Sequence, residues 1–312
     1  MTSRSRGVRY ERRKDGSART SRAVTAVIIV VIFLVLCAIV SVVIGIALGK
    51  RADQVDIKSK YSFSFEPYKS GDKTVRAVDA FYYRLGTDAK GYISDGKGDL
   101  SLALRHVEGD LTFKSSTAEA AGIAQNEISL SLKEEVEYIH SLGGYICAYI
   151  CSSALECEDE YLRAIYKAYE IALINEAAEC GVDDILIVGL EINETNIAEI
   201  EKFVSDAAMA AGKAPLGVLV SRELLLATAD GSYVASRVGA VCDYLALDLR
   251  ALDKSADEAP EGEETSPLDA LIGELEYYIE AYRLRAILSR ENSSLYSALK
   301  ELGFTNIQII AE

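Results

Sequence analysis

The chain has 312 residues and a net charge of −15, with 33 Lys and Arg against 48 Asp and Glu. Residues 1–51 contribute +8, which leaves −23 for residues 52–312. An acidic surface of that size argues against binding to nucleic acid or to anionic lipid headgroups. The roughly 260 residues of this acidic part are enough to bury one large core.

Residues 23–48 form one apolar run of 26 residues in which the polar side chains are those of Thr25 and Ser41. At the helical rise this run spans about 39 Å, more than the roughly 30 Å hydrocarbon core of a bilayer. A cleaved secretory signal has an apolar region of only about 7–15 residues, so we expect an uncleaved signal anchor. Residues 1–22 form a basic arm, which places the N-terminus in the cytoplasm. We therefore expect a single-pass protein of the cell membrane with an extracytoplasmic C-terminal domain.

Residues 49–73 are polar with scattered aromatic side chains, which indicates a stalk before a domain at 74–312. The cysteines beyond the membrane run are odd in number, which is not typical of a disulfide framework. They are Cys147, Cys151, Cys157, Cys180 and Cys242. A Cys151–Cys157 bridge stays an open alternative to free thiols. The chain's two histidines, His106 and His140, have no cysteine partners at zinc-site spacing, so we expect no metal and no cofactor.

After the stalk, short β-rich runs alternate with helical patterns. The expected strands are Val75–Tyr83, Leu100–His106, Gly144–Cys151, Asp184–Ile192, Pro215–Ser221, Cys242–Leu249, Leu284–Ser289 and Asn306–Ala311. Most are continuous apolar runs, as expected of parallel strands that are buried on both faces. The expected helices are Ser131–Ser141, Glu158–Cys180, Thr195–Ala211, Leu268–Tyr282 and Ser293–Leu302.

Eight strands with intervening helices predict an α/β fold, a closed (β/α)8 TIM-like barrel. The competing fold is an open doubly wound sheet, but no Gly-rich phosphate loop follows the first strand. In a barrel of this kind the active site lies at the C-terminal ends of the strands. Closure predicts that the first and last strands, Val75–Tyr83 and Asn306–Ala311, lie side by side.

Several sequence segments, in the same order, resemble those of a bacterial family of glycoside-hydrolase-like TIM barrels, many of them membrane-anchored. VRAVDAFYY is similar to its opening strand, and LSLALRHVEGDLTFKSS to its second strand with a following hairpin. LKEEVEYIHSLGGYICAYI resembles a helix of that family that ends in His-x-x-Gly, together with the strand that follows it. VCDYLALDL resembles its sixth strand. The resemblance runs from about Val75 to Ala311. It implies an extracytoplasmic glycoside-hydrolase-like domain.

The chain departs from that family at the strand tips. Where the family's second strand ends in Lys-Asp, this chain has Arg105 and His106, and Tyr149 replaces an Arg in the third strand. Asp248 and Arg250 stand where the sixth strand of the family has Met and Tyr. The family therefore implies a tip site whose original chemistry is lost. Together with Tyr83, the positions Arg105, His106, Tyr149 and Arg250 are our candidate ligand-binding residues.

The fourth strand of the family ends in Asp-Tyr-x-Arg, and this chain has Val188-Gly189-Leu190-Glu191 there. Glycoside hydrolysis needs two carboxylates about 5–9.5 Å apart. Glu191 and Asp248 are the candidate catalytic pair, against the alternative that both are solvated surface acids. Glu191 points away from the Val188 face along an extended strand, so we expect no glycosidase turnover.

Sugar sites commonly carry flat aromatic platforms. The chain has no Trp but 18 Tyr, and a Tyr offers both a ring face and a hydroxyl. Three hypotheses therefore remain for the C-terminal domain. It is a non-catalytic module that binds carbohydrate or a cell-envelope partner, an active glycoside hydrolase using Glu191 and Asp248, or a structural spacer that docks other proteins.

Overall fold

The structure, a computed structural model, describes residues 68, 73–123, 125, 130–153, 155–229, 232–252, 284–291, 293–301 and 304–310. All of them belong to the second of two compact units, which span Met1–Asp56 and Ile57–Glu312. The expected membrane run at 23–48 and the expected helix at Leu268–Tyr282 lie outside the described residues. Among the helices that are described, none is both long and apolar enough to cross a membrane.

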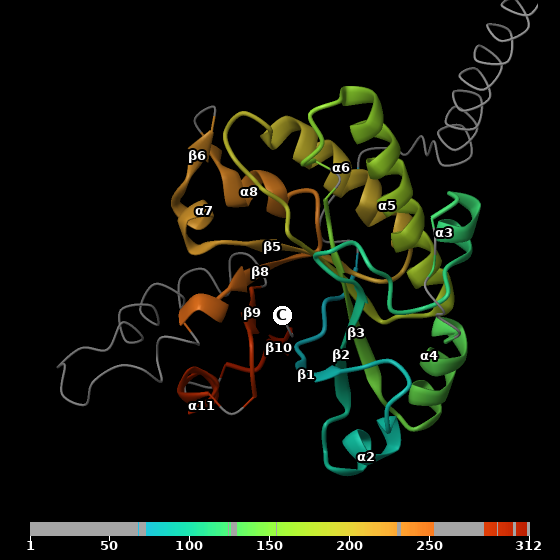
Figure 1. Cartoon of the computed structure of the whole chain (residues 1–312). Coiled ribbons are helices and arrows are strands. Elements are labelled where there is room, and N and C mark those ends of the chain that lie inside the picture. Colours follow the sequence, from blue (N-terminus) through green and yellow to red (C-terminus); the bar gives the residue numbers. More distant parts are fainter. Residues whose placement is uncertain are drawn as a thin grey trace, which may run out of the picture. The chain divides into compact units, whose positions relative to one another are not determined.

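Eight parallel strands close into a barrel (Figure 1). They are β1 (Asp79–Tyr83), β2 (Asp99–Arg105), β3 (Tyr145–Cys151), β4 (Asp184–Val188), β5 (Leu216–Val220), β8 (Tyr244–Asp248), β9 (Arg285–Leu288) and β10 (Ile307–Ile309). Each strand pairs with its neighbour in this order, and β10 returns to pair with β1, with Ile307 opposite Asp79. The predicted closed α/β barrel is confirmed, and the open sheet is excluded.

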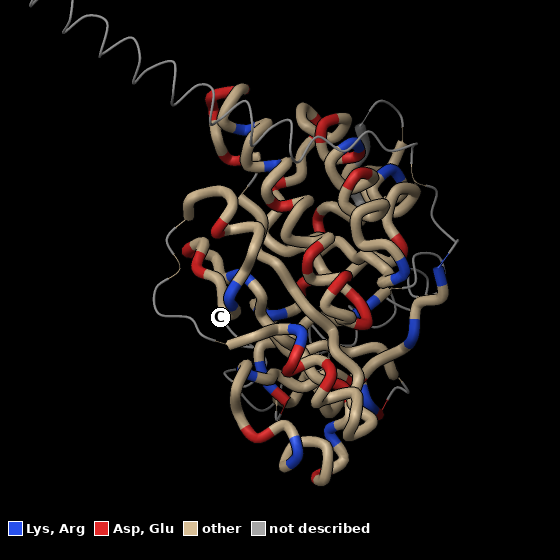
Figure 2. Tube along the Cα trace, turned by 90° about the vertical axis from the view of Figure 1, so that its right-hand side faces the viewer, with Lys and Arg blue, Asp and Glu red and all other residues tan. Residues whose placement is uncertain are grey.

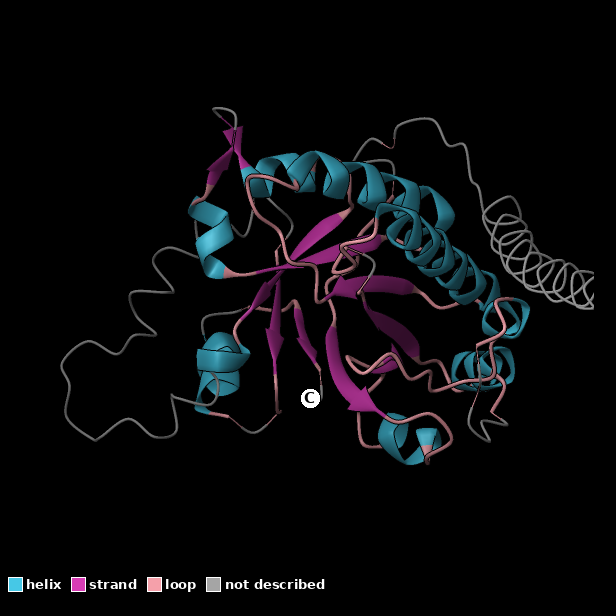
Figure 3. Cartoon of the chain, turned by 45° about the horizontal axis from the view of Figure 1, so that its top comes forward, coloured by secondary structure: helices cyan, strands magenta, loops and turns pink. Residues whose placement is uncertain are grey.

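The helices surround the strands (Figure 3). They are α2 (Ala89–Ser94), α3 (Ser116–Ala120), α4 (Leu132–Ser141), α5 (Glu160–Cys180), α6 (Ile197–Ala210), α7 (Arg222–Leu226), α8 (Val234–Gly239) and α11 (Ser294–Glu301). A short antiparallel ribbon pairs β6 (Thr228–Ala229) with β7 (Ser232–Tyr233). The four predicted helices that fall on described residues are confirmed to within two residues at each end.

Local sequence explains where these helices begin and end. The Ser131 hydroxyl accepts from the Glu134 amide and caps α4, and Asp159 caps α5 through the Leu162 amide. Gly181 ends α5 in the left-handed region at φ 93°, a conformation that glycine adopts readily and that commonly terminates helices. His140 lies in the last turn of α4, and its Nε2 is 2.8 Å from Asp183 Oδ2.

The fourth strand is shorter than predicted. We expected it to run to Ile192, but β4 ends at Val188 and Gly189 turns the chain at φ 82°. A Cβ on Gly189 would lie 3.2 Å from the Ser152 carbonyl oxygen, so this turn requires glycine for space as well as for conformation. The chain therefore leaves the barrel wall at Gly189, three residues before Ile192.

The middle of the barrel interior is filled by apolar side chains from alternate strand positions. Ala103, Tyr149, Leu186, Ala246 and Ile287 belong to one buried cluster there. Because side chains alternate along a strand, each of these residues marks the inward face of its own strand. This assignment fixes which strand-end residues share the inward face.

A buried polar network lies at the N-terminal ends of the strands. The Arg285 guanidinium, fully buried, holds both carboxylate oxygens of Asp184 at 3.1 and 2.8 Å. It also donates to the Tyr244 hydroxyl and to Gln308 Oε1, each at 3.0 Å. Gly217 provides the room, since a Cβ there would lie 2.2 Å from the Tyr244 ring. The network ties β4, β8, β9 and β10 together across the barrel.

Two residues of the expected stalk contact the barrel. The Tyr68 hydroxyl donates to Asp243, and the Tyr68 amide donates to Ser205 Oγ at 2.9 Å. The Lys73 ammonium donates to the carbonyls of Ala208 and Ala214 at 2.8 and 2.9 Å. These contacts lie where the chain approaches the N-terminal ends of β5 and β8.

The cysteines beyond the membrane run are all free, so the alternative of a Cys151–Cys157 bridge is wrong. Cys151 is the buried last residue of β3, whereas Cys157 is partly exposed and lies in the loop before α5. On the side of the molecule seen in Figure 2, acidic and basic residues are interspersed along helices and loops.

Candidate functional site

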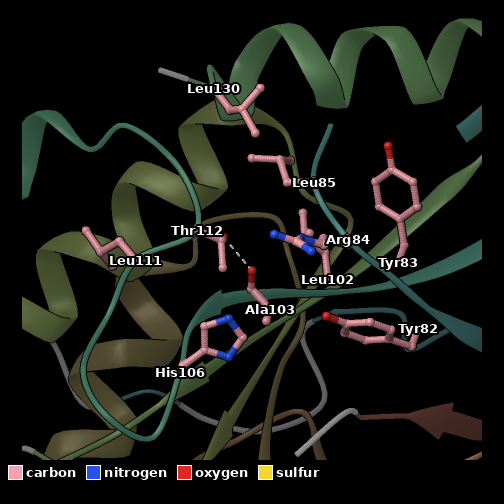
Figure 4. A pocket seen from close by; sticks show the side chains of 10 residues that line it. All are labelled: Tyr82, Tyr83, Arg84, Leu85, Leu102, Ala103, His106, Leu111, Thr112 and Leu130. Atoms are coloured by element: carbon pink, nitrogen blue, oxygen red, sulfur yellow. Dashed lines mark hydrogen bonds between the residues drawn. The ribbon is translucent and has the colours of Figure 1, made fainter. Parts of the chain in front are cut away.

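Two cavities open at the C-terminal ends of the strands. The first, here the β1/β2 cavity, has a volume of about 400 Å³ and is lined by Tyr82, Tyr83, Arg84, Leu85, Leu102, Ala103, His106, Leu111, Thr112 and Leu130 (Figure 4). The second, the β5/β8 cavity, has a volume of about 570 Å³ and is lined by Ser221, Arg222, Glu223, Asp248, Arg250, Ala251 and Leu252. Both are large enough for one or two sugar rings.

Local turns position the polar wall of the β1/β2 cavity. After β1 the chain turns with the Thr87 amide donating to the Arg84 carbonyl at 3.1 Å, which leaves the Arg84 side chain exposed. At the end of β2 the pairing register shifts between Ala103 and Arg105, and such a bulge re-aims the side chains that follow it. A hairpin then returns the chain, with the His106 amide donating to the Asp110 carbonyl at 2.9 Å.

Thr112 closes this hairpin against the strand. Its amide donates to the Leu104 carbonyl at 3.1 Å, and its hydroxyl donates to the Ala103 carbonyl at 2.6 Å (Figure 4). Since the hydroxyl proton is engaged, the lone pairs of this oxygen are what Thr112 presents to the cavity. Thr112 can therefore accept a hydrogen bond from a ligand hydroxyl.

Tyr82 and Tyr83 face opposite ways at the end of β1. Tyr83 is fully buried, and its hydroxyl donates to the Glu135 carboxylate of α4 and to the Thr87 carbonyl. Burial, and then the Glu135 carboxylate, raise the pKa of Tyr83. Tyr82 shares the inward face of Ala80 and is partly exposed. Of the two, Tyr82 has the ring and hydroxyl available to a ligand.

Arg105, the last residue of β2, contacts the end of β3 and helix α5. One guanidinium nitrogen contacts Glu170 of α5 at 2.5 Å and the Cys151 carbonyl at 2.8 Å, and the other donates to Ser153 Oγ at 2.9 Å. Burial raises the pKa of the Glu170 carboxyl, although Arg105 and Ser152 oppose that shift. These contacts give Arg105 a structural role, and it lies outside the described lining of both cavities.

Tyr149 and Glu191 occupy very different places. Tyr149 is only 1% exposed and fills the barrel interior beside Leu186 and Ala246. Glu191 is exposed on the loop after β4, where its carbonyl accepts from the Asn196 side-chain amide at 2.7 Å. The described lining of the β5/β8 cavity includes Asp248 but not Glu191.

Asp248 is the last residue of β8 and shares the inward face of Tyr244 and Ala246. Both of its oxygens are bound by Arg250, through Nε at 3.0 Å and Nη2 at 2.7 Å. Burial alone would raise the pKa of Asp248, but the hydrogen bonds and charge of Arg250 outweigh burial and lower it. Asp248 is therefore an ionised, paired carboxylate at neutral pH.

Glu223 is the second carboxylate of the β5/β8 cavity, and sequence reasoning did not single it out. A hydrogen bond from Ser221 lowers the pKa of Glu223. A glycosidase needs one carboxyl group that stays protonated to act as the acid, usually through a raised pKa. The pKa values of Asp248 and Glu223, the two carboxyl groups that line this cavity, are both lowered instead.

The ligand-binding residues proposed from the sequence also did not include Tyr82, Arg84 and Thr112. For Tyr82 a signal was present, because strict alternation places it on the opposite face from Tyr83. Arg84 and Thr112 gave none, since their position depends on a turn and a hairpin. Within the described ranges, no cluster of His, Cys, Asp and Glu has the arrangement of a metal site.

No protein-family model matches the chain. No curated protein matches it either. Among solved structures, it is similar to the spore cortex-lytic enzyme SleL of Bacillus cereus, with 12% identity over 69% of this chain and 50% of that chain and a TM-score of 0.41. The chain thus spans about half the length of that enzyme.

Two further solved structures show comparable values. A sugar phosphate isomerase/epimerase from Parabacteroides distasonis is 14% identical over 78% of this chain and 91% of its own, with a TM-score of 0.44. A chitinase from Chromobacterium violaceum is 13% identical over 68% of each chain, with a TM-score of 0.41.

Proposed function

We propose that this chain is a membrane-anchored, extracytoplasmic barrel that binds a saccharide in the β1/β2 cavity without hydrolysing it. The observation that carries the proposal is the lining of that cavity. Its described residues combine the Tyr82 ring, apolar side chains such as Leu85 and Leu111, and the polar groups of His106 and Thr112. Sugar rings offer the same combination of apolar faces and hydroxyl groups.

The absence of hydrolysis is argued from the carboxylates. No Asp or Glu is among the described lining residues of the β1/β2 cavity. In the β5/β8 cavity, Asp248 is bound by Arg250, and the pKa values of Asp248 and Glu223 are both lowered. A bound sugar in either place therefore meets no described carboxyl group whose pKa suits a general acid.

Binding can be tested with the full-length chain in lipid nanodiscs, by isothermal titration with a panel of neutral and acidic oligosaccharides. We expect at least one to bind, and Tyr82→Ala to weaken that binding about tenfold through loss of the aromatic contact. Tyr138→Ala is the matched control, because Tyr138 is an exposed tyrosine of α4, 46% accessible, that does not line the cavity. If no saccharide binds, or both variants weaken binding equally, the proposal fails.

The anchoring part of the proposal rests on the apolar run at 23–48 and the basic arm before it. Protease added to intact cells is expected to digest the region after Lys50. Protection of that region until the membrane is opened would overturn the proposed orientation.

A further inference from the structure

We propose that the β1/β2 cavity selects a saccharide that carries an oxyanion, a carboxylate or a phosphate, and that Arg84 and His106 bind this group. The inference rests on the proposed saccharide-binding function and narrows its ligand class. It follows from the charges and unused hydrogen-bond donors of the cavity.

Arg84 differs from the other described arginines in having no partner. Ion pairs engage Arg76, Arg105, Arg163, Arg237, Arg250 and Arg285. Arg222 and Arg290 have further interactions of their own. Among the described residues, the guanidinium of Arg84 alone makes no hydrogen bond, ion pair or ring contact. Because Arg84 also lines the β1/β2 cavity, its guanidinium is available to a ligand bound there.

The other donors of the cavity are also unused. Within the described part of the chain, the His106 ring and the Tyr82 hydroxyl make no hydrogen bond, and both residues line the same cavity as Arg84. Figure 4 shows these side chains arranged around the ends of the two strands. No described carboxylate lines the cavity to compete for them. The cavity is thus rich in donors within an acidic domain.

The chemistry of these groups fits an acidic sugar better than a neutral one. The planar guanidinium of Arg84 matches the two oxygens of a carboxylate or a phosphate, and such charge-assisted pairs are about twice as strong as neutral hydrogen bonds. The Tyr82 ring offers an apolar face to the sugar ring. Thr112 completes the site as an acceptor, because its own proton is donated to the Ala103 carbonyl.

Titration of the full-length chain in nanodiscs tests this selection. The probes are trigalacturonic acid, its fully methyl-esterified form, glucose 1-phosphate and inorganic phosphate, all at one ionic strength. We expect the acid to bind at least about tenfold more tightly than the ester, the ratio that one charge-assisted hydrogen bond supplies. If glucose 1-phosphate shows the stronger binding instead, the oxyanion is a phosphate, and the inference holds.

Arg84→Gln is expected to abolish the preference for the acid over the ester, and Arg84→Lys to retain part of it, because the charge remains without the fork. Arg76→Gln is the matched control. It removes the same charge, but Arg76 pairs with Asp99, the first residue of β2, at the end of that strand opposite to the cavity. This variant should leave the preference for the acid over the ester intact.

Three results would overturn the inference. Equal affinity for acid and ester in the unaltered chain, with glucose 1-phosphate bound no more tightly than the ester, would remove the anion selectivity and leave saccharide binding in place. Equal affinity for inorganic phosphate and glucose 1-phosphate would show that the sugar ring is not recognised. Failure of acid, ester and sugar phosphate to bind would reject the anion selection, whereas the saccharide-binding function itself fails only if no member of the oligosaccharide panel binds.

Discussion

Replacing Arg285 by methionine tests the buried polar network of the barrel. Arg285 is fully buried and donates to Asp184, Tyr244 and Gln308, with an additional bond from Nε to Asn306 Oδ1 at 3.1 Å. Methionine has a similar length but no donors. Asp184, also fully buried, would then keep, among the described residues, the Tyr244 hydroxyl at 3.4 Å and the Cys147 thiol at 3.6 Å as its side-chain partners.

The expected cost is set by the charge left behind. Removing one partner of a buried ion pair destabilises a protein by about 3–5 kcal/mol, because the remaining charge is desolvated without compensation. For a domain of this size, each kcal/mol lowers the melting temperature by about 2–4 °C, so the fall should be about 6–20 °C. Such a loss is a large fraction of a typical total stability of about 5–15 kcal/mol.

The double variant Arg285→Met/Asp184→Leu separates charge from packing. It removes both ions, and replacing a buried pair by apolar residues is often neutral. Gln308 would keep its bond to Ser101 Oγ at 3.1 Å. The measurement is urea unfolding followed by tyrosine fluorescence, since the chain has 18 Tyr and no Trp. A single variant that loses less than about 1 kcal/mol, or a double variant no more stable than the single one, would refute the reasoning.

Three other predictions concern the strand ends. Gly189→Ala should lower the free energy of unfolding by about 1–3 kcal/mol, because φ is 82° and Ser152 is close; an unchanged urea midpoint would contradict this. The pKa of Asp248 is lowered from 3.8 by Arg250 despite burial, so this pair stabilises the fold above about pH 4, and stability is lost as the pH falls further. Asp248→Asn should therefore flatten the acid limb of stability measured from pH 6 to 3. Reducing-end assays should detect no polysaccharide hydrolysis; turnover abolished by Glu191→Gln or Asp248→Asn would show that the chain is a glycosidase.

The barrel itself could be predicted because its strands are buried on both faces. Runs such as YICAYIC at β3 and DILIV at β4 contain almost no polar residues, which is typical of parallel strands under a layer of helices. The helical patterns between the strands located the described helices equally well. Two strand ends were predicted wrongly. The first strand was expected from Val75 but begins at Asp79, and β4 ends early because Gly189 lies inside an apolar run whose pattern continues past the turn.

The candidate site was less predictable, because the role of a polar residue depends on partners far away in sequence. Arg105 was a candidate ligand-binding residue, and its ion-pair partner Glu170 lies 65 residues further on, in α5. Tyr149 was another candidate, and its side chain fills the barrel interior. His106 does line a cavity, as does Arg250. Whether either binds a ligand remains a prediction.

The contacts of Tyr68 and Lys73 also bear on how the domain carries mechanical load. They hold the incoming chain beside Ala214 and Asp243, which precede β5 and β8, whereas both cavities lie at the other ends of the strands. A pull between a bound ligand and this attachment point therefore acts along the barrel. Rows of interstrand hydrogen bonds would then be loaded in shear and resist together, instead of opening one after another from an edge.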